Sequence, residues 1–351
     1  MVAGDNTPRR GTVTELITRL LDREYNRAAG PVLRAIATST SSGLIRRRLN
    51  ELDAEARRLA EAGQRLTPDN PVLRALLADM RDTLRGDGAL IGSASDPVQR
   101  GAIDAAGRVQ RQLALPGLTN QQLARLGITW TSPDPEAVAR LVEYTQSDAF
   151  QNLLRQFPDE IVATLRNQAI RGISRGWSPL YTAERLLEMT QALPAHRANT
   201  ILRTLQVTSY RDSTAVHQNV NAALAQQIIR IAALDPRTCL SCVAQHGDII
   251  WDADRDAGSR PIPRVDDHWS GRCTSVMIVK GRPRAIQTGE DWFNSLPPDR
   301  QAQQRSFANS PGKLEAWREG RVTLRDFVHP HRDDVFGPML REAGLTEALS
   351  K

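Results

Sequence analysis

The three cysteines of the 351-residue chain, Cys239, Cys242 and Cys273, all fall within one 35-residue window, and His268 lies just ahead of the last. A Cys-x-x-Cys turn directs two sulfurs toward one centre, and zinc takes four nitrogen or sulfur ligands in a tetrahedron. The spacing therefore predicts a closed structural zinc site formed by Cys239, Cys242, His268 and Cys273. The alternative is three reduced thiols in a small hydrophobic patch, with His268 exposed.

Two further groups near the cysteines could also bind a metal. His246 follows Cys242 by four residues and could replace His268 as a ligand. The segment 252–267 holds five aspartates, whose oxygen atoms suit a hard cation. We interpret this segment as a solvated acidic loop.

Length and composition favour a folded protein of two or three domains. Apolar residues make up 40% of the chain and charged residues 25%. The first ten residues lack the apolar run of a secretory leader, and no segment approaches the roughly 18 apolar residues of a membrane span. We therefore expect a protein made and kept in a reducing cytoplasm, with no membrane partner.

The basic charge is carried almost entirely by arginine. Only Lys280, Lys313 and Lys351 are lysines, so 43 of the 46 basic residues are arginines, and the formal net charge is +6. The planar guanidinium group binds phosphates and carboxylates through two donors at once. Acidic residues interleave with the arginines along the chain, so this balance permits contact with DNA without requiring it.

Hydrophobic periodicity predicts an α+β protein that is mainly α-helical. Apolar residues at helical spacing run from residue 11 to residue 227. Asn70-Pro71 and Ser178-Pro179 are typical helix starts, because proline fits the first helical position. We also predict a helix start at Asp96-Pro97, a stop near Pro158 and a restart at Pro194.

The pattern changes to short strands after residue 227. Runs of β-branched residues predict strands at 228–231, 248–251 and 274–279, separated by the cysteine-bearing turns. Three short strands bury little surface, so a metal bound there would stabilise the module by linking its segments. The expected fold is therefore a helical N-terminal two-thirds followed by a three-stranded, zinc-ribbon-like Cys/His module and a helical tail.

This reading divides the chain into four regions. Residues 1–130 form an N-terminal helical region or arm, and residues 131–227 form a helical core domain. Residues 228–281 form the Cys/His β module, and residues 282–351 form a helical, aromatic tail. The end of this tail, from Val335 to Lys351, reads as a mobile segment.

Several motifs between about Gly172 and Gly281 resemble the bacteriophage head morphogenesis family, also called minor head proteins. They are Gly-x-x-x-Gly-x-Ser from Gly172, the pair Arg203-Thr204, the Cys-x-x-Cys and the terminal His…Cys segment. The family's usual last element is His-x-x-Cys-x-Cys, and Gly271 stands here in place of its first cysteine. The aromatic tail from Gly289 resembles an extension that many members carry.

The resemblance implies a structural role without a catalytic residue. It implies a virion protein of a tailed phage, located in the head near the portal vertex. Its implied partners are the portal protein, the major capsid or scaffolding protein, and the packaged DNA.

Two other functions remain open from the sequence. The first is a metal-dependent nuclease of the His-Asn-His type, suggested by Asp267-His268 beside a Cys-x-x-Cys. Such an enzyme also needs downstream ligands, for which Asn294, His329 and His331 are the candidates. The second is a DNA-binding protein that acts free in the cytoplasm.

Overall fold

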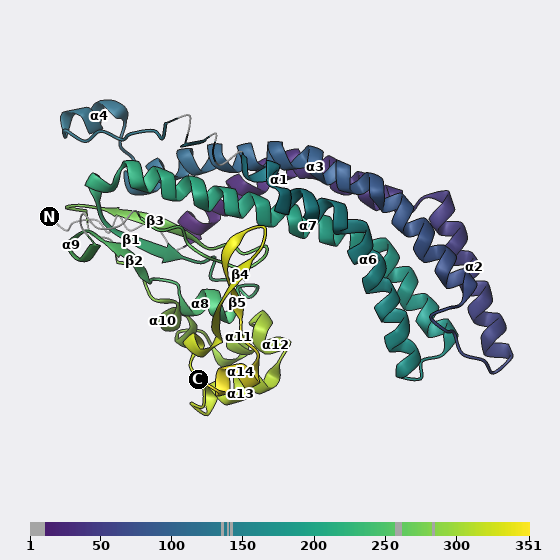
Figure 1. Cartoon of the computed structure of the whole chain (residues 1–351). Coiled ribbons are helices and arrows are strands. Elements are labelled where there is room, and N and C mark those ends of the chain that lie inside the picture. The colour runs from purple at the N-terminus through teal and green to yellow at the C-terminus, as the bar shows by residue number, and fades with distance from the viewer. Residues whose placement is uncertain (1–10, 135–136, 139, 141–142, 257–261, 283–284) are drawn as a thin grey trace. The chain divides into compact units, whose positions relative to one another are not determined.

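The structure is a computed structural model that describes residues 11–134, 137–138, 140, 143–256, 262–282 and 285–351. Long helices precede a small antiparallel sheet, and short helices follow it (Figure 1). The predicted α+β, mainly α fold class is therefore confirmed. In the described part of the chain, no helix is both long and apolar enough to cross a membrane.

The N-terminal two-thirds consists of helices. Their bounds are α1 (Gly11–Ser39), α2 (Gly43–Glu61), α3 (Pro71–Ala114), α4 (Asn120–Arg125), η1 (Glu143–Gln146), α6 (Asp148–Ser174), α7 (Pro179–Val220) and η2 (Ala222–Leu224). The predicted starts of α3 and α7 are confirmed: Asn70 Oδ1 accepts from the backbone N–H of Val72 at 3.0 Å, and Ser178 Oγ accepts from that of Tyr181 at 3.2 Å.

The three helix breaks predicted at internal prolines are wrong. Pro97 lies inside α3, Pro158 inside α6 and Pro194 inside α7. A proline inside a helix removes one backbone hydrogen bond and costs about 3 kcal/mol. These helices are 27 to 44 residues long and bury apolar side chains on both sides of each proline, so burial offsets that cost.

The neighbouring helix accommodates one of these prolines. Pro158 cannot donate a hydrogen bond to the carbonyl of Leu154, one helical turn earlier in α6. That carbonyl lies against Gly88 of α3, where an added Cβ would be 2.8 Å from the oxygen. Glycine at position 88 therefore allows α3 and α6 to approach closely where the carbonyl has lost its helical donor.

We expect Gly88→Ala to destabilise this helix contact by about 1–3 kcal/mol, because a backbone atom blocks the new methyl group. Gly86→Ala is the matched control: it lies in the same helix, and its added Cβ meets nothing within 4 Å. The control should be neutral or stabilising by up to about 1 kcal/mol. Chemical denaturation of both variants measures the difference, and equal effects would contradict the packing argument.

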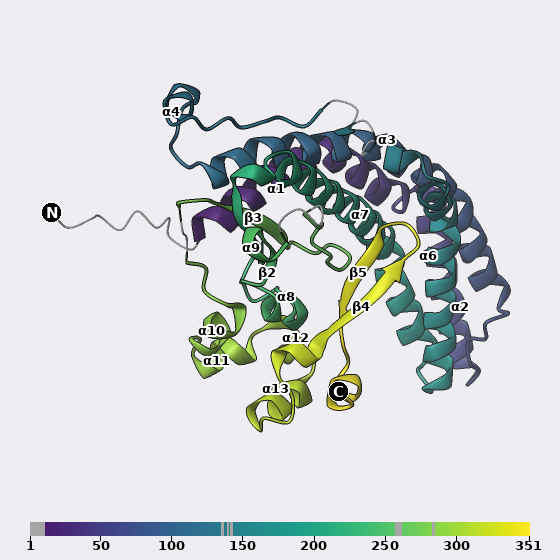
Figure 2. The ribbon, with the colours of Figure 1, turned by 60° about the vertical axis from the view of Figure 1, so that its left-hand side comes forward.

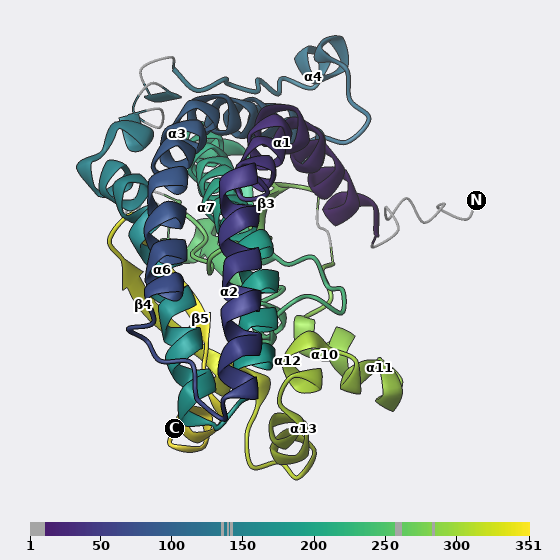
Figure 3. The same ribbon diagram turned by 90° about the vertical axis from the view of Figure 1, so that its right-hand side faces the viewer.

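The chain divides into two compact units, and α1, α3 and α7 contribute residues to both. Unit 2 comprises residues 25–98 and 143–203 and is helical. Within it, α2 runs beside α3 (Figure 3), and Arg48 bridges to Asp79 at 2.6 Å. Unit 1 comprises residues 1–24, 99–142 and 204–351 and contains the sheet. The four-region division at 130, 227 and 281 remains a prediction.

The central sheet of unit 1 has the order β2-β1-β3, with both neighbours antiparallel to β1. Its strands are β1 (Ala225–Ile231), β2 (Ile249–Asp252) and β3 (Thr274–Val279), so the three predicted strands are confirmed. Ile229 and Ile231 point from β1 into a core with Val109 of α3 and Tyr210 of α7. Residues 228, 230 and 232 point to the opposite face.

Between and after these strands the chain forms short helices. Their bounds are α8 (Leu240–Ala244), α9 (Ala253–Asp256), α10 (Gly289–Asn294), α11 (Pro298–Ala302), α12 (Arg305–Ala308), α13 (Pro311–Arg318), η3 (Leu324–Phe327) and α14 (Leu345–Leu349). The helical, aromatic tail predicted for 282–351 packs Phe293, Phe307 and Phe327 against Leu240 and Val243 of α8. Its aromatic residues therefore form a core around the cysteine-bearing helix.

The tail also contains a hairpin that the sequence analysis missed. β4 (Val328–Asp333) pairs with β5 (Gly337–Glu342), and Pro330 lies opposite Leu340 (Figure 2). Pro330 between two histidines predicts a loop. In a two-stranded ribbon, however, one edge of each strand is unpaired, and a proline there loses no hydrogen bond of the sheet because it needs no N–H donor. The prediction of a mobile segment from Val335 is not borne out, because β5 and α14 occupy it.

Candidate metal centre

The Cys-x-x-Cys forms the first turn of α8. Cys239 is the N-cap residue, and its Sγ accepts from the backbone N–H of Cys242 at 3.4 Å. The preceding turn is held by Asp235, whose carboxylate accepts two hydrogen bonds from Arg272, at 2.6 and 2.7 Å. Because Arg272 directly precedes Cys273, this ion pair ties the two cysteine segments together.

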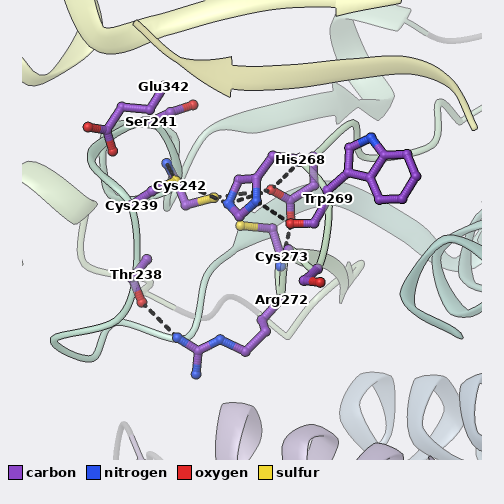
Figure 4. Close-up of polar contacts among 12 residues, drawn as sticks. Thr238, Cys239, Ser241, Cys242, His268, Trp269, Arg272, Cys273 and Glu342 are labelled. Atoms are coloured by element: carbon purple, nitrogen blue, oxygen red, sulfur yellow. Dashed lines mark hydrogen bonds and ion pairs between the residues drawn. The ribbon is translucent and has the colours of Figure 1, made fainter. Parts of the chain in front are cut away.

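The segment before β3 brings the other two predicted ligands to the same place (Figure 4). His268 Nε2 lies 3.2 Å from the Sγ of Cys239. A tight turn follows, in which Ser270 has a φ of 56° and the N–H of Gly271 donates to the carbonyl of His268 at 2.9 Å. The turn reverses the direction of the chain, so that Cys273, which directly precedes β3, lies close to Cys242.

Two overlapping groups of side chains could hold a metal ion within the described residues. One is Cys239, Cys242 and His268, and the other is Cys242, Asp267 and Cys273. Within each group, the ligand atoms lie within 4.8 Å of one another. The structure thus brings all four predicted ligand residues into one cluster around Cys242 and adds Asp267.

Asp267 organises this cluster. Its carboxylate is buried and accepts from Arg211 Nη2 at 2.7 Å, from the backbone N–H of Cys273 at 2.9 Å and from that of His268 at 2.8 Å. The thiol of Cys242 also donates to it, at 3.2 Å. The sequence pattern indicates for Asp267 only an acidic loop or a nuclease motif, because nothing local points to a partner 56 residues earlier.

Gly271 makes room for that carboxylate. A Cβ built on Gly271 would lie 2.1 Å from Oδ2 of Asp267 and 2.2 Å from its Cγ. The position where the head morphogenesis pattern has a cysteine is therefore occupied here by the Asp267 side chain. A side chain at position 271 would therefore displace this carboxylate.

A second set of contacts orients His268. Its Nδ1 lies 2.8 Å from the carbonyl oxygen of Trp269 and donates to it, so Nε2 is the ring nitrogen that faces Cys239. Trp269 is held in turn by the missed hairpin: its indole N–H donates to Asp333 at 2.9 Å, and its ring meets Phe336 edge-on at 5.0 Å. Metal-binding histidines commonly donate their other N–H to a carbonyl in this way.

Burial and neighbouring charge shift the pKa values of these groups. The hydrogen bond with Cys239 and burial raise the pKa of Cys242 to about 12, and contact with Cys242 and burial also raise that of Cys273. Burial alone would raise the pKa of Asp267, but Arg211 reverses this effect and lowers it. Burial lowers the pKa of His268, and the opposing charge of Asp267 raises it to about 10.

Residues 163–276 match the family model of Phage Mu protein F like proteins, a phage head morphogenesis family. The resemblance is confirmed over this segment. The match runs from α6 to β3 and includes every residue of the cluster. No curated protein and no solved structure matches the chain.

The donors of the cluster fit a metal that prefers sulfur and nitrogen. Three cysteines and one histidine are the ligand types of closed structural zinc sites, and the carbonyl contact of His268 supplies the expected supporting hydrogen bond. His246, the alternative ligand, belongs to neither group in the described residues, and its Nδ1 accepts the backbone N–H of Ala232 at 2.8 Å.

This buried His246 predicts a pH dependence of stability. Burial lowers its pKa to about 4, whereas an unfolded histidine titrates near 6.5. The folded state therefore binds fewer protons between these values, and the free energy of unfolding falls as the pH drops from 6.5 toward 4. His246→Asn keeps an acceptor for the N–H of Ala232 but does not titrate. Between pH 7.0 and 4.5 its free energy of unfolding should therefore fall by about 2 kcal/mol less than that of the wild type.

The measurement is urea unfolding of both proteins at pH 7.0 and 4.5. His196→Asn is the control, because His196 is exposed on α7. That variant should follow the wild-type pH dependence. Parallel pH profiles for the wild type and His246→Asn would contradict the prediction.

Proposed function

We propose that the protein is a minor head protein of a tailed phage, a structural component that docks at the portal or on the inner wall of the capsid. The observation that carries this proposal is the match of residues 163–276 to a head morphogenesis family. In this chain the same residues contain the Cys/His cluster, β1, β2 and the start of β3. The docking position and the virion location belong to the proposal.

In this proposal Cys239, Cys242, His268 and Cys273 hold a structural zinc ion. Zinc bound by these residues would join α8 to the segment before β3. Its role would be structural, without a part in any reaction. Support comes from the soft donors, from the burial of Cys242 and Cys273, and from the orientation of His268 by Trp269. A metal link suits a three-stranded sheet, which buries little surface unaided.

A structural role fits the surroundings of the histidines that a nuclease would require. His268 faces Cys239 from within the cluster, and one histidine cannot readily serve as zinc ligand and general base at once. His329 of β4 is paired with Glu347 of α14 at 2.6 Å, and Asn294 is exposed on α10. We therefore assign no catalytic residue in this proposal.

The proposed partners are the portal protein and the major capsid or scaffolding protein, with contact to packaged DNA through arginine. Arginine suits either role, since its guanidinium group pairs with carboxylates and with phosphates. Salt-titrated DNA binding separates the two, because phosphate-driven affinity falls steeply with salt. Retention in heads at salt concentrations that release DNA would favour docking to protein.

Removal of one ligand tests both parts of the proposal. We expect the wild type to carry one zinc ion per chain, and His268→Ala to lose it together with incorporation into heads. His196→Ala, at an exposed histidine on α7, should retain both. The measurements are metal content by mass spectrometry and the amount of protein relative to the portal in purified heads.

The possible results separate the two parts. Wild-type protein without zinc would contradict the metal assignment alone. Absence of the wild-type protein from procapsids and virions would contradict the head role.

A further inference from the structure

A buried arginine without a matching acid lies next to the cluster. Arg230 belongs to β1, and only 4% of its surface is exposed. Its Nε and Nη2 atoms are buried and have no hydrogen-bond partner among the described residues. Arginine stays protonated in proteins, so this side chain carries a full positive charge into the interior.

Nearby acids are already committed to other bases. Asp267 is bridged by Arg211, at 2.7 Å. Asp235 is paired with Arg272, and Asp266, whose side chain is 40% exposed, lies 3.6 Å from Arg264. A buried unpaired charge is strongly unfavourable, so the fold must supply a counter-charge in its working state.

The sulfur atoms are the remaining candidates for that counter-charge. Arg230 points to the face of the sheet that carries the cysteines, because it alternates with Ile229 and Ile231 of the opposite core. Burial acts to lower the pKa of Arg230, but the charges of Cys273, Asp267 and Cys242 outweigh it and raise this pKa. Cys242 and Cys273 pack against Ala232, which follows Arg230 on this face, so two of the three cysteines lie on the same side of β1 as the guanidinium group.

A divalent cation bound in the cluster would balance these charges. With neutral thiols, Asp267 offsets only one of the two buried guanidinium charges, those of Arg211 and Arg230, so at least one positive charge is left over. A divalent cation bound by three thiolates and one neutral imidazole carries one net negative charge. That charge matches Arg230, so the loaded centre is neutral in total.

We propose that Arg230 is the buried counter-ion of a metal–thiolate centre and favours a divalent cation bound by three thiolates. The proposal rests on the zinc site proposed above, and it adds a residue that touches no metal. Arg230 acts on the metal through the field it creates at the sulfur atoms, because electrostatic interactions are strong where water is excluded.

The test is Arg230→Met, measured with and without metal. We expect this variant to bind zinc at least tenfold more weakly than the wild type, in competition with a chromophoric chelator. The metal-free variant should resist urea at least as well as the metal-free wild type, because an unpaired buried charge has been removed. A residue with only a packing role would instead destabilise both forms.

Two further variants complete the design. Arg325→Met also removes an arginine of unit 1, but one that is 59% exposed and whose charge Asp248 already balances, so zinc affinity should change less than threefold. Arg230→Lys keeps the charge, so it should recover most of the lost affinity, and it also serves if the methionine variant fails to fold. With cobalt as probe, the charge-transfer band of three thiolates should remain in Arg230→Lys.

The outcomes distinguish this proposal from the one on which it rests. Wild-type protein that binds no zinc or cobalt overturns both. Normal zinc binding by the wild type, with unchanged affinity in Arg230→Met, overturns the counter-ion role and leaves the zinc site standing. Equal loss of affinity in Arg230→Lys and Arg230→Met would also overturn it, since charge would then be irrelevant.

Discussion

Asp267→Ala is expected to lower the free energy of unfolding of unit 1 by about 3–5 kcal/mol. The substitution removes one partner of a fully buried ion pair, in which the side chains of Arg211 and Asp267 are 3% and 0% exposed. It also leaves the backbone N–H groups of His268 and Cys273 without their acceptor. The loss exceeds the net contribution of the pair, because the charge of Arg211 then remains buried and uncompensated.

Urea unfolding in the presence of excess chelator measures this effect independently of any metal. Glu319→Ala is the control, since Glu319 and Arg321 form an exposed pair with side chains 50% and 48% accessible. An exposed pair of this kind contributes at most about 1 kcal/mol. A loss of similar size in both variants would show that Asp267 does not organise the site.

Gly271→Ala is expected to cost about 3 kcal/mol, although it adds a single methyl group. The new Cβ would lie 2.1 Å from the Asp267 carboxylate, so the carboxylate must move. It cannot move freely, because Arg211 and two backbone N–H groups hold it. Part of the cost of losing Asp267 would therefore appear in a variant that keeps the aspartate.

A double-mutant cycle separates this mechanism from ordinary strain at a glycine. In an Asp267→Ala background the obstructing carboxylate is absent, so Gly271→Ala should cost about 2 kcal/mol less than in the wild type. Gly344→Ala, at an exposed glycine whose added Cβ meets nothing within 4 Å, should change stability by less than about 1 kcal/mol. Additive effects of the two substitutions would refute the proposed clash.

Local sequence patterns determined the elements of this fold. Helical periodicity predicted the long helices, and β-branched runs predicted β1, β2 and β3, because side-chain spacing depends on the backbone repeat alone. The same patterns failed at Pro97, Pro158 and Pro194. The free-energy cost of a proline inside a helix is visible in the local sequence. The burial of the rest of the helix offsets this cost, and that burial depends on residues far away along the chain.

The candidate site shows the same division between sequence and tertiary structure. The spacing of the cysteines along the sequence was enough to predict Cys239, Cys242, His268 and Cys273 as one set of ligands, because clustered cysteines can be recognised without a structure. Only the tertiary structure showed that Asp267 is held by Arg211, 56 residues away, and that the β4–β5 hairpin holds Trp269. Neither the ion pair nor the packing of the hairpin on Trp269 produces a periodic pattern in the sequence. These contacts contribute free energy only in the folded chain, where water is excluded around them.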